Sequence, residues 1–405
     1  MWNVKKMKVG CASMWCTLLL LICPMIMAAV GDTPSTVETQ NVTQNITYCE
    51  KTNDVIPVVL SADNNYGPQM YITMLSILKN SNVDTRYDFY LLVSPNFEKR
   101  YKYFILELGD QYGCKINFID MGSAFADSPL GSGWPAPTYY RLLIPGLLPN
   151  CKKCLYLDTD IIVRHDLAEL FNTDLKDCYI AGSDRYAVID EFEYLSSINL
   201  DSTKYYVNAG VLVMNLDLMR RDNLQEKLVS TVKHGVDGKK AFMWPDQDAL
   251  NIICRGRMKI LDLKFNVSPG ILDVILNAGD FLSKMKEFYG EKQFGEACND
   301  PLILHFAGRK PWETHVSTLD YRWWEICRLS PFYEEMLYKY TASMVMADID
   351  AKIDAVRREC NRNCTPGYNK CNYYRCIILS KLTFGKKKAH YQHKCEEIKK
   401  VLGIH

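Results

Sequence analysis

The stretch Cys154-Leu-Tyr-Leu-Asp-Thr-Asp-Ile-Ile-Val163 places two carboxylates between two apolar runs. Runs this apolar are typical of strands covered on both faces, so we expect them at the centre of a sheet. Carboxylates at such a place are costly unless a positive group compensates them. Asp158 and Asp160 share a face only where the chain is extended, because successive side chains of a strand point in opposite directions. They then predict a site for one hard divalent cation, and the alternative is a strand-end turn with solvated carboxylates.

Beyond this stretch, apolar strand-like runs alternate with segments of helical spacing. Such alternation predicts an α/β architecture with a mostly parallel sheet. Further strands are expected at residues 55–60, 87–93, 115–120, 178–182, 208–215 and 302–306. Helices are expected at residues 68–80, 97–108, 138–144, 166–171, 222–233 and 245–253.

The net charge and the N-terminal residues indicate which partners and which cellular compartment to expect. The chain has 405 residues and a formal net charge of +1, which gives no argument for a nucleic-acid or membrane-surface partner. Three lysines precede an apolar run over residues 9–30, which is just long enough to cross a hydrocarbon core of about 30 Å. Pro24 and the small residues after it instead resemble the end of a signal peptide. Residues 1–30 are therefore a cleaved signal peptide or a type II signal anchor.

Either leader places the rest of the chain in the secretory pathway lumen, in the Golgi or endoplasmic reticulum, or secretes it after cleavage. Residues 31–53 are expected to be a glycosylated linker, with acceptor motifs at Asn41 and Asn45. A third motif starts at Asn363, whereas Asn266-Val-Ser268 is a poor acceptor because a proline follows it.

Cysteine usage is high, with 16 residues. Three of these lie in the leader, and in an oxidising lumen the others are expected to be largely disulfide-bonded. Because the remainder is odd, at least one cysteine lacks an intrachain partner.

Residues 331–405 are expected to form a helical and cysteine-rich C-terminal extension. Its cysteines are Cys360, Cys364, Cys371, Cys376 and Cys395. Four thiolates could hold a zinc ion, but the oxidising compartment favours disulfides. The lysine run at residues 386–388 is interpreted as a solvated face, with an anionic partner as the alternative.

Polar residues follow the first expected strand. In a parallel sheet, ligands bind in the crevice beyond the carboxyl ends of the strands. Asp63 and Asn65 are placed there to hydrogen-bond a nucleoside, and Tyr66 could stack on a base. An ordinary polar turn between strand and helix explains these residues equally well.

Two further clusters suit sugar and phosphate chemistry. Asp246 and Gln247 open a helix and together supply an acceptor and a donor for hydroxyl groups, although Asp246 could simply be an N-cap. His305 ends a strand and is a candidate metal ligand, although a lone histidine is more often a core residue. Gly308 permits close backbone approach, and Lys310 suits a diphosphate as a point charge.

Taken in order, these blocks resemble glycosyltransferase family 8. The blocks are Ala62-Asp-Asn-Asn-Tyr66, Thr138-Tyr-Tyr-Arg141, Leu155-Tyr-Leu-Asp-Thr-Asp160, Asn208-Ala-Gly210, Asp246-Gln-Asp248, His305-Phe-Ala-Gly308 and Lys310-Pro-Trp312. The resemblance covers roughly residues 55–330 and implies a catalytic domain at 54–330 with a GT-A fold. A GT-A fold has a mixed, mostly parallel sheet flanked by helices. The resemblance also implies a retaining transferase that uses a UDP-sugar and Mn²⁺.

The same resemblance implies a role for each candidate residue. The metal ligands would be Asp158, Asp160 and His305. The uridine contacts would be Asp63, Asn65 and Tyr66, and the diphosphate contacts Gly308 and Lys310. The donor-sugar contacts would be Arg141, Asn208 and Asp246, with Gln247 near the anomeric carbon. One departure is that Arg309 alone separates Gly308 from Lys310, where many members of the family have two residues.

The implied reaction moves a hexosyl or pentosyl unit to a glycan, glycoprotein or glycolipid acceptor. Because Gln247 stands where a carboxylate nucleophile would be expected, we favour attack on the face of the leaving group, with a departing phosphate oxygen taking the acceptor proton. The alternatives are a catalytically silent nucleotide-sugar or glycan-binding module and a UDP-sugar hydrolase. Which sugar and which acceptor are used is left open, and residues 124–138 and 184–204 are candidate acceptor loops.

Overall fold

The structure is a computed structural model that describes residues 55–125, 134–184, 192–200, 206–235, 242–277, 279–363, 375–381 and 385–402. The predicted leader, the linker with Asn41 and Asn45, and most of both candidate acceptor loops lie outside these residues.

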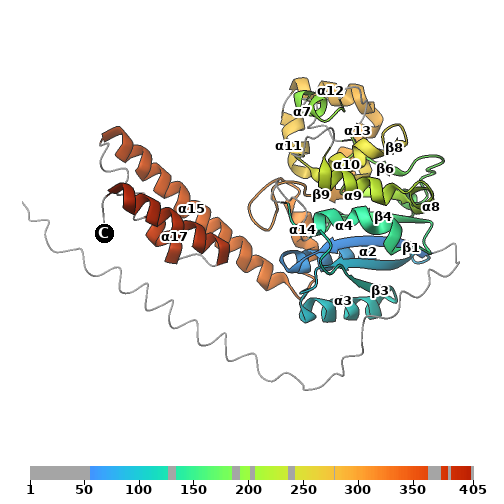
Figure 1. Ribbon diagram of the computed structural model, residues 1–405, viewed down its shortest axis with the longest axis horizontal. Helices are drawn as coiled ribbons and strands as arrows, with labels where there is room; N and C mark the ends of the chain where they lie inside the picture. The colour runs from blue at the N-terminus through green and yellow to red at the C-terminus, as the bar shows by residue number, and fades with distance from the viewer. Residues whose placement is uncertain are drawn as a thin grey trace, which may run out of the picture. The chain divides into compact units, whose positions relative to one another are not determined.

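The main sheet has seven strands in the order β3-β2-β1-β4-β7-β6-β8. Several of its strands, with helices packed around them, are labelled in Figure 1. The pairs β3–β2, β2–β1, β1–β4 and β6–β8 are parallel, and β7 runs antiparallel to both neighbours. A separate antiparallel pair consists of β5 and β9. The strands are β1 Val55–Ala62, β2 Arg86–Val93, β3 Lys115–Asp120, β4 Lys153–Leu157, β5 Ile161–Val163, β6 Ile180–Gly182, β7 Val211–Asn215, β8 Met258–Ile260 and β9 Ile303–His305. The predicted mixed, mostly parallel sheet is confirmed.

The helices also follow the predicted alternation. The α-helices are α2 Gly67–Lys79, α3 Lys99–Tyr112, α4 Pro137–Tyr140, α5 Ile144–Leu147, α6 Ala168–Phe171, α7 Phe192–Ser197, α8 Leu216–Arg221, α9 Leu224–His234, α10 Pro245–Ile253, α11 Pro269–Asn277, α12 Gly279–Tyr289, α13 Glu291–Asn299, α14 Asp320–Cys327, α15 Tyr333–Asn363 and α17 Gly385–Leu402. Short 3₁₀ turns are η1 Asn64–Tyr66, η2 Arg141–Leu143 and η4 Leu263–Phe265. The helix predicted at 138–144 is divided into α4, η2 and α5, because Pro137 and Pro145 each begin a new helical turn.

Both faces of the central strands are buried, and alternate residues of these strands supply the two halves of the core. In β4, Leu155 and Leu157 pack with residues of α2 and α3. Cys154 and Tyr156 point to the other face and pack with residues of α4, α8, α9 and α10. A strand covered on both faces has to be apolar at every position, which is why the run before Asp158 predicted a central strand.

The chain bends at the two aspartates. β4 ends at Leu157, and residues 158–160 form a bend before β5 begins. Because β4 belongs to the large sheet and β5 pairs with β9, Asp158 and Asp160 lie where the two sheets meet. The expectation that an extended chain gives both carboxylates a common face is therefore wrong, and the bend brings them together instead.

Hydroxyl groups on α2 hold this bend. Thr73 Oγ1 donates to the carbonyl oxygens of Thr159, at 3.0 Å, and Ile161, at 2.9 Å. Ser76 Oγ accepts from the backbone N–H of Val163 at 3.0 Å. β9 satisfies one edge of β5, and these side chains of α2 satisfy polar backbone groups that β9 leaves free. The position of the aspartates thus depends on a helix that contributes no residue to the candidate site.

The expected disulfides are not formed by the nine cysteines whose thiols the structure describes. Seven of these lie within residues 55–330. Buried ones such as Cys154 and Cys254 pack among apolar side chains. A cysteine in such a place behaves as a small hydrophobic residue, which corrects the interpretation made from the count alone. The thiols of Cys360, Cys364 and Cys371 lie outside the described residues.

From Tyr333 onward the chain is helical wherever it is described. Met336, in the first turns of α15, is buried in the same hydrophobic core as α2 and α3, so that helix begins on this core. Arg375 pairs with Asp350 and Asp354 of α15, each at 3.1 Å. None of the described helices is both long and apolar enough to cross a membrane.

Replacing Thr73 by valine is expected to lower the free energy of unfolding by about 1–3 kcal/mol, because two buried carbonyl groups lose their donor. Thr231→Val is the matched control, since that buried hydroxyl bonds only to Lys227 of its own helix. The control should cost less than about 1 kcal/mol. Urea denaturation followed by circular dichroism measures both, and equal losses would contradict the role assigned to Thr73.

Candidate active site

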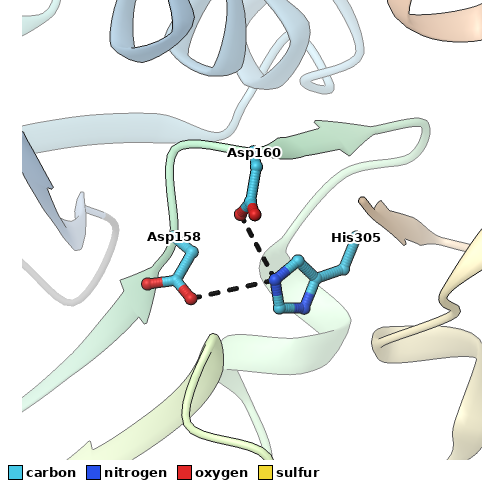
Figure 2. A group of neighbouring side chains, drawn as sticks. All are labelled: Asp158, Asp160 and His305. Atoms are coloured by element: carbon cyan, nitrogen blue, oxygen red, sulfur yellow. Dashed lines mark ion pairs between the residues drawn. The ribbon is translucent and has the colours of Figure 1, made fainter. Parts of the chain in front are cut away.

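Two aspartates and a histidine converge where the two sheets meet (Figure 2). His305 Nε2 lies 3.2 Å from Asp160 Oδ1 and 3.7 Å from Asp158 Oδ2. One possible ligand atom from each residue falls within 4.8 Å of the others. The structure thus brings together the three residues predicted as metal ligands.

Backbone pairing fixes this arrangement. His305 is the partner of Ile161 in the β5–β9 ladder, next to Asp160. The backbone N–H of Phe306 donates to the carbonyl of Asp160 at 2.9 Å, and that of Asp158 donates to the carbonyl of Gly210 at 2.8 Å.

The three residues lie at the carboxyl ends of the central strands. β1 and β4 are parallel neighbours, while β2 and β3 continue on the other side of β1. The order of connection reverses between β1 and β4, and ligands of open α/β sheets bind in the crevice at such a reversal. Asp63 follows β1 and Asp158 follows β4, so both flank this crevice.

The donor set fits a divalent cation. Asp160 Oδ1 is buried and has no hydrogen-bond partner in the described part of the chain, although His305 Nε2 is close by. Carboxylate oxygens and an imidazole nitrogen together suit divalent ions such as Mn²⁺. A cation held here would satisfy the buried oxygen and balance the charge of both aspartates.

Lys310 is the second positive group of the site. Its Nζ donates to Asp160 Oδ2 and, at 2.9 Å, to the carbonyl of Phe306. Although burial opposes the shift, Lys310 and His305 hold the pKa of Asp160 well below its usual range. Burial likewise opposes the charge of Lys310, but Asp160 keeps its pKa above the ordinary value. Gly308 has a φ of +88°, a backbone conformation that favours glycine.

Arg141 forms ion pairs with two carboxylates, one of which belongs to the triad of Asp158, Asp160 and His305. It is 5% exposed, and its guanidinium contacts Asp158 Oδ1 at 2.8 Å and Asp246 Oδ2 at 3.0 Å. Nη1 donates to the carbonyl of Ala209 at 2.5 Å, and the guanidinium lies over the Tyr156 ring at 4.4 Å. Although burial opposes it, Asp158 and Asp246 raise the pKa of Arg141. Its observed contacts orient these carboxylates, and the predicted contact to a donor sugar remains a prediction.

Asp246 is not the N-cap of α10. Trp244 is the capping residue, and its backbone N–H donates to Asp248 Oδ2 at 3.0 Å. Asp246 lies in the first turn, where burial raises its pKa to about 6 although Arg141 acts in the opposite direction. The neighbouring Gln247 turns its Oε1 toward Asn208 Nδ2, at 3.1 Å, and toward the backbone N–H of Ala209, at 3.0 Å.

The three predicted uridine contacts lie in the short turn η1 and its N-cap, directly after β1. Asp63 accepts hydrogen bonds from Asn65, at 2.9 Å from its backbone N–H and at 3.1 Å from its Nδ2. Tyr66 packs edge-on against Trp312, with ring centroids 6.0 Å apart, and burial raises its pKa to about 12 although Lys310 acts to lower it. These contacts are those of a polar turn after a strand, so the nucleoside role stays a prediction.

Most of the other predicted residues line a cavity of about 400 Å³. Its polar wall includes Arg141, Asp158, Asp160, Asn208, Asp246, Gln247, His305, Gly308 and Lys310. Its apolar lining includes Leu263, Val267, Ile271, Leu272, Ile275 and Phe294. The cavity therefore has room for a small polar group against the triad.

Two residues that line this cavity and lie close to His305 had no predicted role. A Cβ atom on Gly210 would lie 2.2 Å from His305 Cε1 and 2.6 Å from Asp158 Oδ2, so only glycine lets the triad close. Glycine at the start of a predicted strand was a usable signal of such close approach. Asn266 Oδ1 lies 2.9 Å from His305 Nδ1. The sequence Asn266-Val-Ser268 indicates only a glycosylation motif and does not predict the contact between Asn266 and His305.

The sequence profile of the family described as Glycosyl transferase family 8 matches residues 57–315, more than half of the chain. The chain belongs to glycosyltransferase family 8. This family consists of retaining hexosyltransferases, and its members typically use a divalent metal. The matched residues include every side chain of the polar wall.

Related proteins agree with this assignment. A putative glycosyltransferase of Haemophilus influenzae is 29% identical over 221 residues, covering 54% of this chain and 65% of that protein. A lipopolysaccharide 1,2-glucosyltransferase of Escherichia coli is 29% identical over 271 residues, covering 64% of this chain and 74% of that protein. The crystal structure of the galactosyltransferase LgtC with donor and acceptor sugar analogues is 26% identical with a TM-score of 0.58, covering 68% of this chain and 96% of that one. The last similarity confirms the predicted GT-A fold.

Gly210→Ala is expected to weaken Mn²⁺ binding by about 10–100-fold, because the added methyl group pushes His305 and Asp158 apart. Isothermal titration with Mn²⁺ measures this. Gly295→Ala is the matched control, since a Cβ there meets nothing within 4 Å, and it should leave the affinity unchanged. An unchanged affinity in Gly210→Ala would contradict the close-approach argument.

Proposed function

We propose that this protein is a Mn²⁺-dependent retaining glycosyltransferase that moves a hexosyl or pentosyl unit from a UDP-sugar to a glycan, glycoprotein or glycolipid. The observation that carries the proposal is the convergence of Asp158, Asp160 and His305 with Lys310 in one cavity. Carboxylates, an imidazole and a lysine together suit a metal–diphosphate group, which a module that binds only glycans does not need.

The chain's own residues would act chiefly on the leaving group. As the glycosidic bond of a UDP-sugar breaks, negative charge grows on the diphosphate oxygens. Lys310, held charged by Asp160, would bind those oxygens, and a divalent cation at the triad would supply further positive charge beside them. Asp246 and Asn208 line the same cavity and would accept and donate hydrogen bonds to sugar hydroxyls.

Attack on the face of the leaving group remains our preferred route. Gln247 Oε1 already accepts two hydrogen bonds, which makes it a poor nucleophile toward the anomeric carbon. A departing phosphate oxygen would then take the proton of the acceptor hydroxyl. Detection of a covalent glycosyl–enzyme by mass spectrometry would contradict this route.

The acceptor and the location of the reaction are less constrained. Three Escherichia coli relatives described as lipopolysaccharide glucosyltransferases support a sugar-bearing acceptor for this chain as well. Action in the secretory lumen is supported by the leader and the glycosylation motifs of the sequence alone.

Incubation with a panel of UDP-sugars, Mn²⁺ and mixed glycan acceptors tests the function. Transfer is expected with at least one donor, and Asp160→Ala should abolish it while circular dichroism stays unchanged, because one ligand and the partner of Lys310 are lost. Release of UDP without transfer to any acceptor would favour the hydrolase. No UDP release with any donor and acceptor would favour the silent binding module, and full turnover of the variant would exclude the assigned metal site.

The affinity for the donor sugar is expected to fall at low pH. Asp246 has a pKa of about 6, above its ordinary value, so its ionised fraction falls as the pH drops through about 6. A neutral carboxyl group loses its attraction to Arg141 and accepts weaker hydrogen bonds from sugar hydroxyls. Calorimetry should show the affinity for a UDP-sugar falling relative to that for UDP between about pH 8 and 5. A constant ratio, or the same slope in Asp246→Asn, would contradict the role of Asp246.

A further inference from the structure

We propose that Asn266 is a positioning residue that fixes the tautomer of His305 through a directional relay of side-chain amides ending at Gln247. The relay consists of His305, Asn266, Asn208 and Gln247, whose contacts measure 2.9, 2.9 and 3.1 Å in that order. The inference rests on the proposed function insofar as His305 is taken as a metal ligand.

Two backbone amides set the direction of the relay. The N–H of Ala209 donates to Gln247 Oε1 at 3.0 Å, and the N–H of Gly210 donates to Asn208 Oδ1 at 3.0 Å. A backbone N–H can only donate, so the atoms facing these two groups have to be the amide oxygens. The orientations of Gln247 and Asn208 are therefore determined by the turn before β7.

The remaining orientations follow in sequence. With its oxygen facing Gly210, Asn208 presents Nδ2 to Gln247. Asn208 Oδ1 is also the atom that faces Asn266, so Asn266 has to present Nδ2 and donate to it at 2.9 Å. The other end of the Asn266 amide is its oxygen, 2.9 Å from His305 Nδ1. Two acceptors do not bond to each other, so Nδ1 carries the proton.

This tautomer suits the metal site. With a cation bound, a neutral imidazole protonated at Nδ1 offers its free electron pair on Nε2, the nitrogen that faces Asp158 and Asp160. The opposite tautomer would bring the unprotonated Nδ1 against Asn266 Oδ1 and direct an N–H at the position of the cation. Partners of this kind orient metal-ligating histidines, and their loss typically weakens metal binding by about 10–100-fold.

The backbone holds Asn266 in place beside His305. Asn266 directly follows η4, and the next residue, Val267, forms a parallel bridge with Leu304 of β9. The N–H of Val267 donates to the carbonyl of Ile303 at 3.0 Å, and the N–H of His305 donates to the carbonyl of Val267 at 2.8 Å. The contact between Asn266 and His305 thus belongs to an ordered pair of segments.

Two substitutions separate the parts of the relay. Asn266→Leu removes the acceptor for His305 and the donor to Asn208. Asn266→Asp keeps an acceptor for His305 but cannot donate to Asn208. Asn117→Leu is the control. Within the described part of the chain, the part-buried amide of Asn117 on β3 bonds only to the carbonyl of Phe89 on the neighbouring strand β2.

The first measurement needs neither metal nor substrate. Nitrogen-15 spectra of the metal-free full chain with labelled histidines, at about pH 8, distinguish the two neutral tautomers, and His305→Gln identifies the signals of His305. Wild type, Asn266→Asp and Asn117→Leu should show the proton on Nδ1. Asn266→Leu should show a mixture or the opposite tautomer. A wild type without a proton on Nδ1 would overturn the proposal without any variant.

The second measurement is the affinity for Mn²⁺ by calorimetry. Asn266→Leu should bind it about 10–100-fold more weakly than wild type, with Asn266→Asp and Asn117→Leu closer to wild type. Unchanged tautomer and affinity in Asn266→Leu would refute the relay even if the protein transfers sugar. The expected spectra in a protein that transfers no sugar would instead support the relay and refute the proposed function.

Discussion

The gathering of three carboxylates in one cavity, two of them buried, is the constraint on which the site depends. Asp158, Asp160 and Asp246 line that cavity, and each needs positive charge close by. Arg141 bridges Asp158 and Asp246, whereas Lys310 pairs with Asp160. Asp184 also lines the cavity, so two fixed cations face four carboxylates and leave an excess of negative charge. That excess is what makes the triad a receptor for a divalent ion rather than a closed ion-pair network.

The sequence was most informative where a local pattern has a single physical explanation. The apolar run before Asp158 predicted a central strand because only a strand covered on both faces is apolar at every position. The ends of strands predicted which polar residues gather, because parallel strands present their carboxyl ends at one edge. The blocks in family order then led to a cavity lined by nine of the twelve predicted residues, all except Asp63, Asn65 and Tyr66.

The remaining features depend on contacts between distant parts of the chain. The bend after Asp158 exists because β5 joins a second sheet, which no pattern within residues 154–163 specifies. Gly210 is required by the space that His305 occupies, almost one hundred positions later. Asn266 follows a short 3₁₀ turn and acts through its position beside β9. The disulfide prediction relied on the cysteine count, which does not distinguish a buried thiol from a bridge.

The pairing of Lys310 with Asp160 couples the affinity of the site for a diphosphate to its affinity for a cation. A diphosphate that binds Lys310 takes it from Asp160, and the aspartate left behind attracts a cation more strongly. Filling either place therefore raises the affinity of the other, and by thermodynamic linkage the factor is the same in both directions. The unliganded protein avoids a bare buried charge by using its own lysine as a temporary counter-ion. The two affinities for UDP, with and without Mn²⁺, would measure that exchange directly.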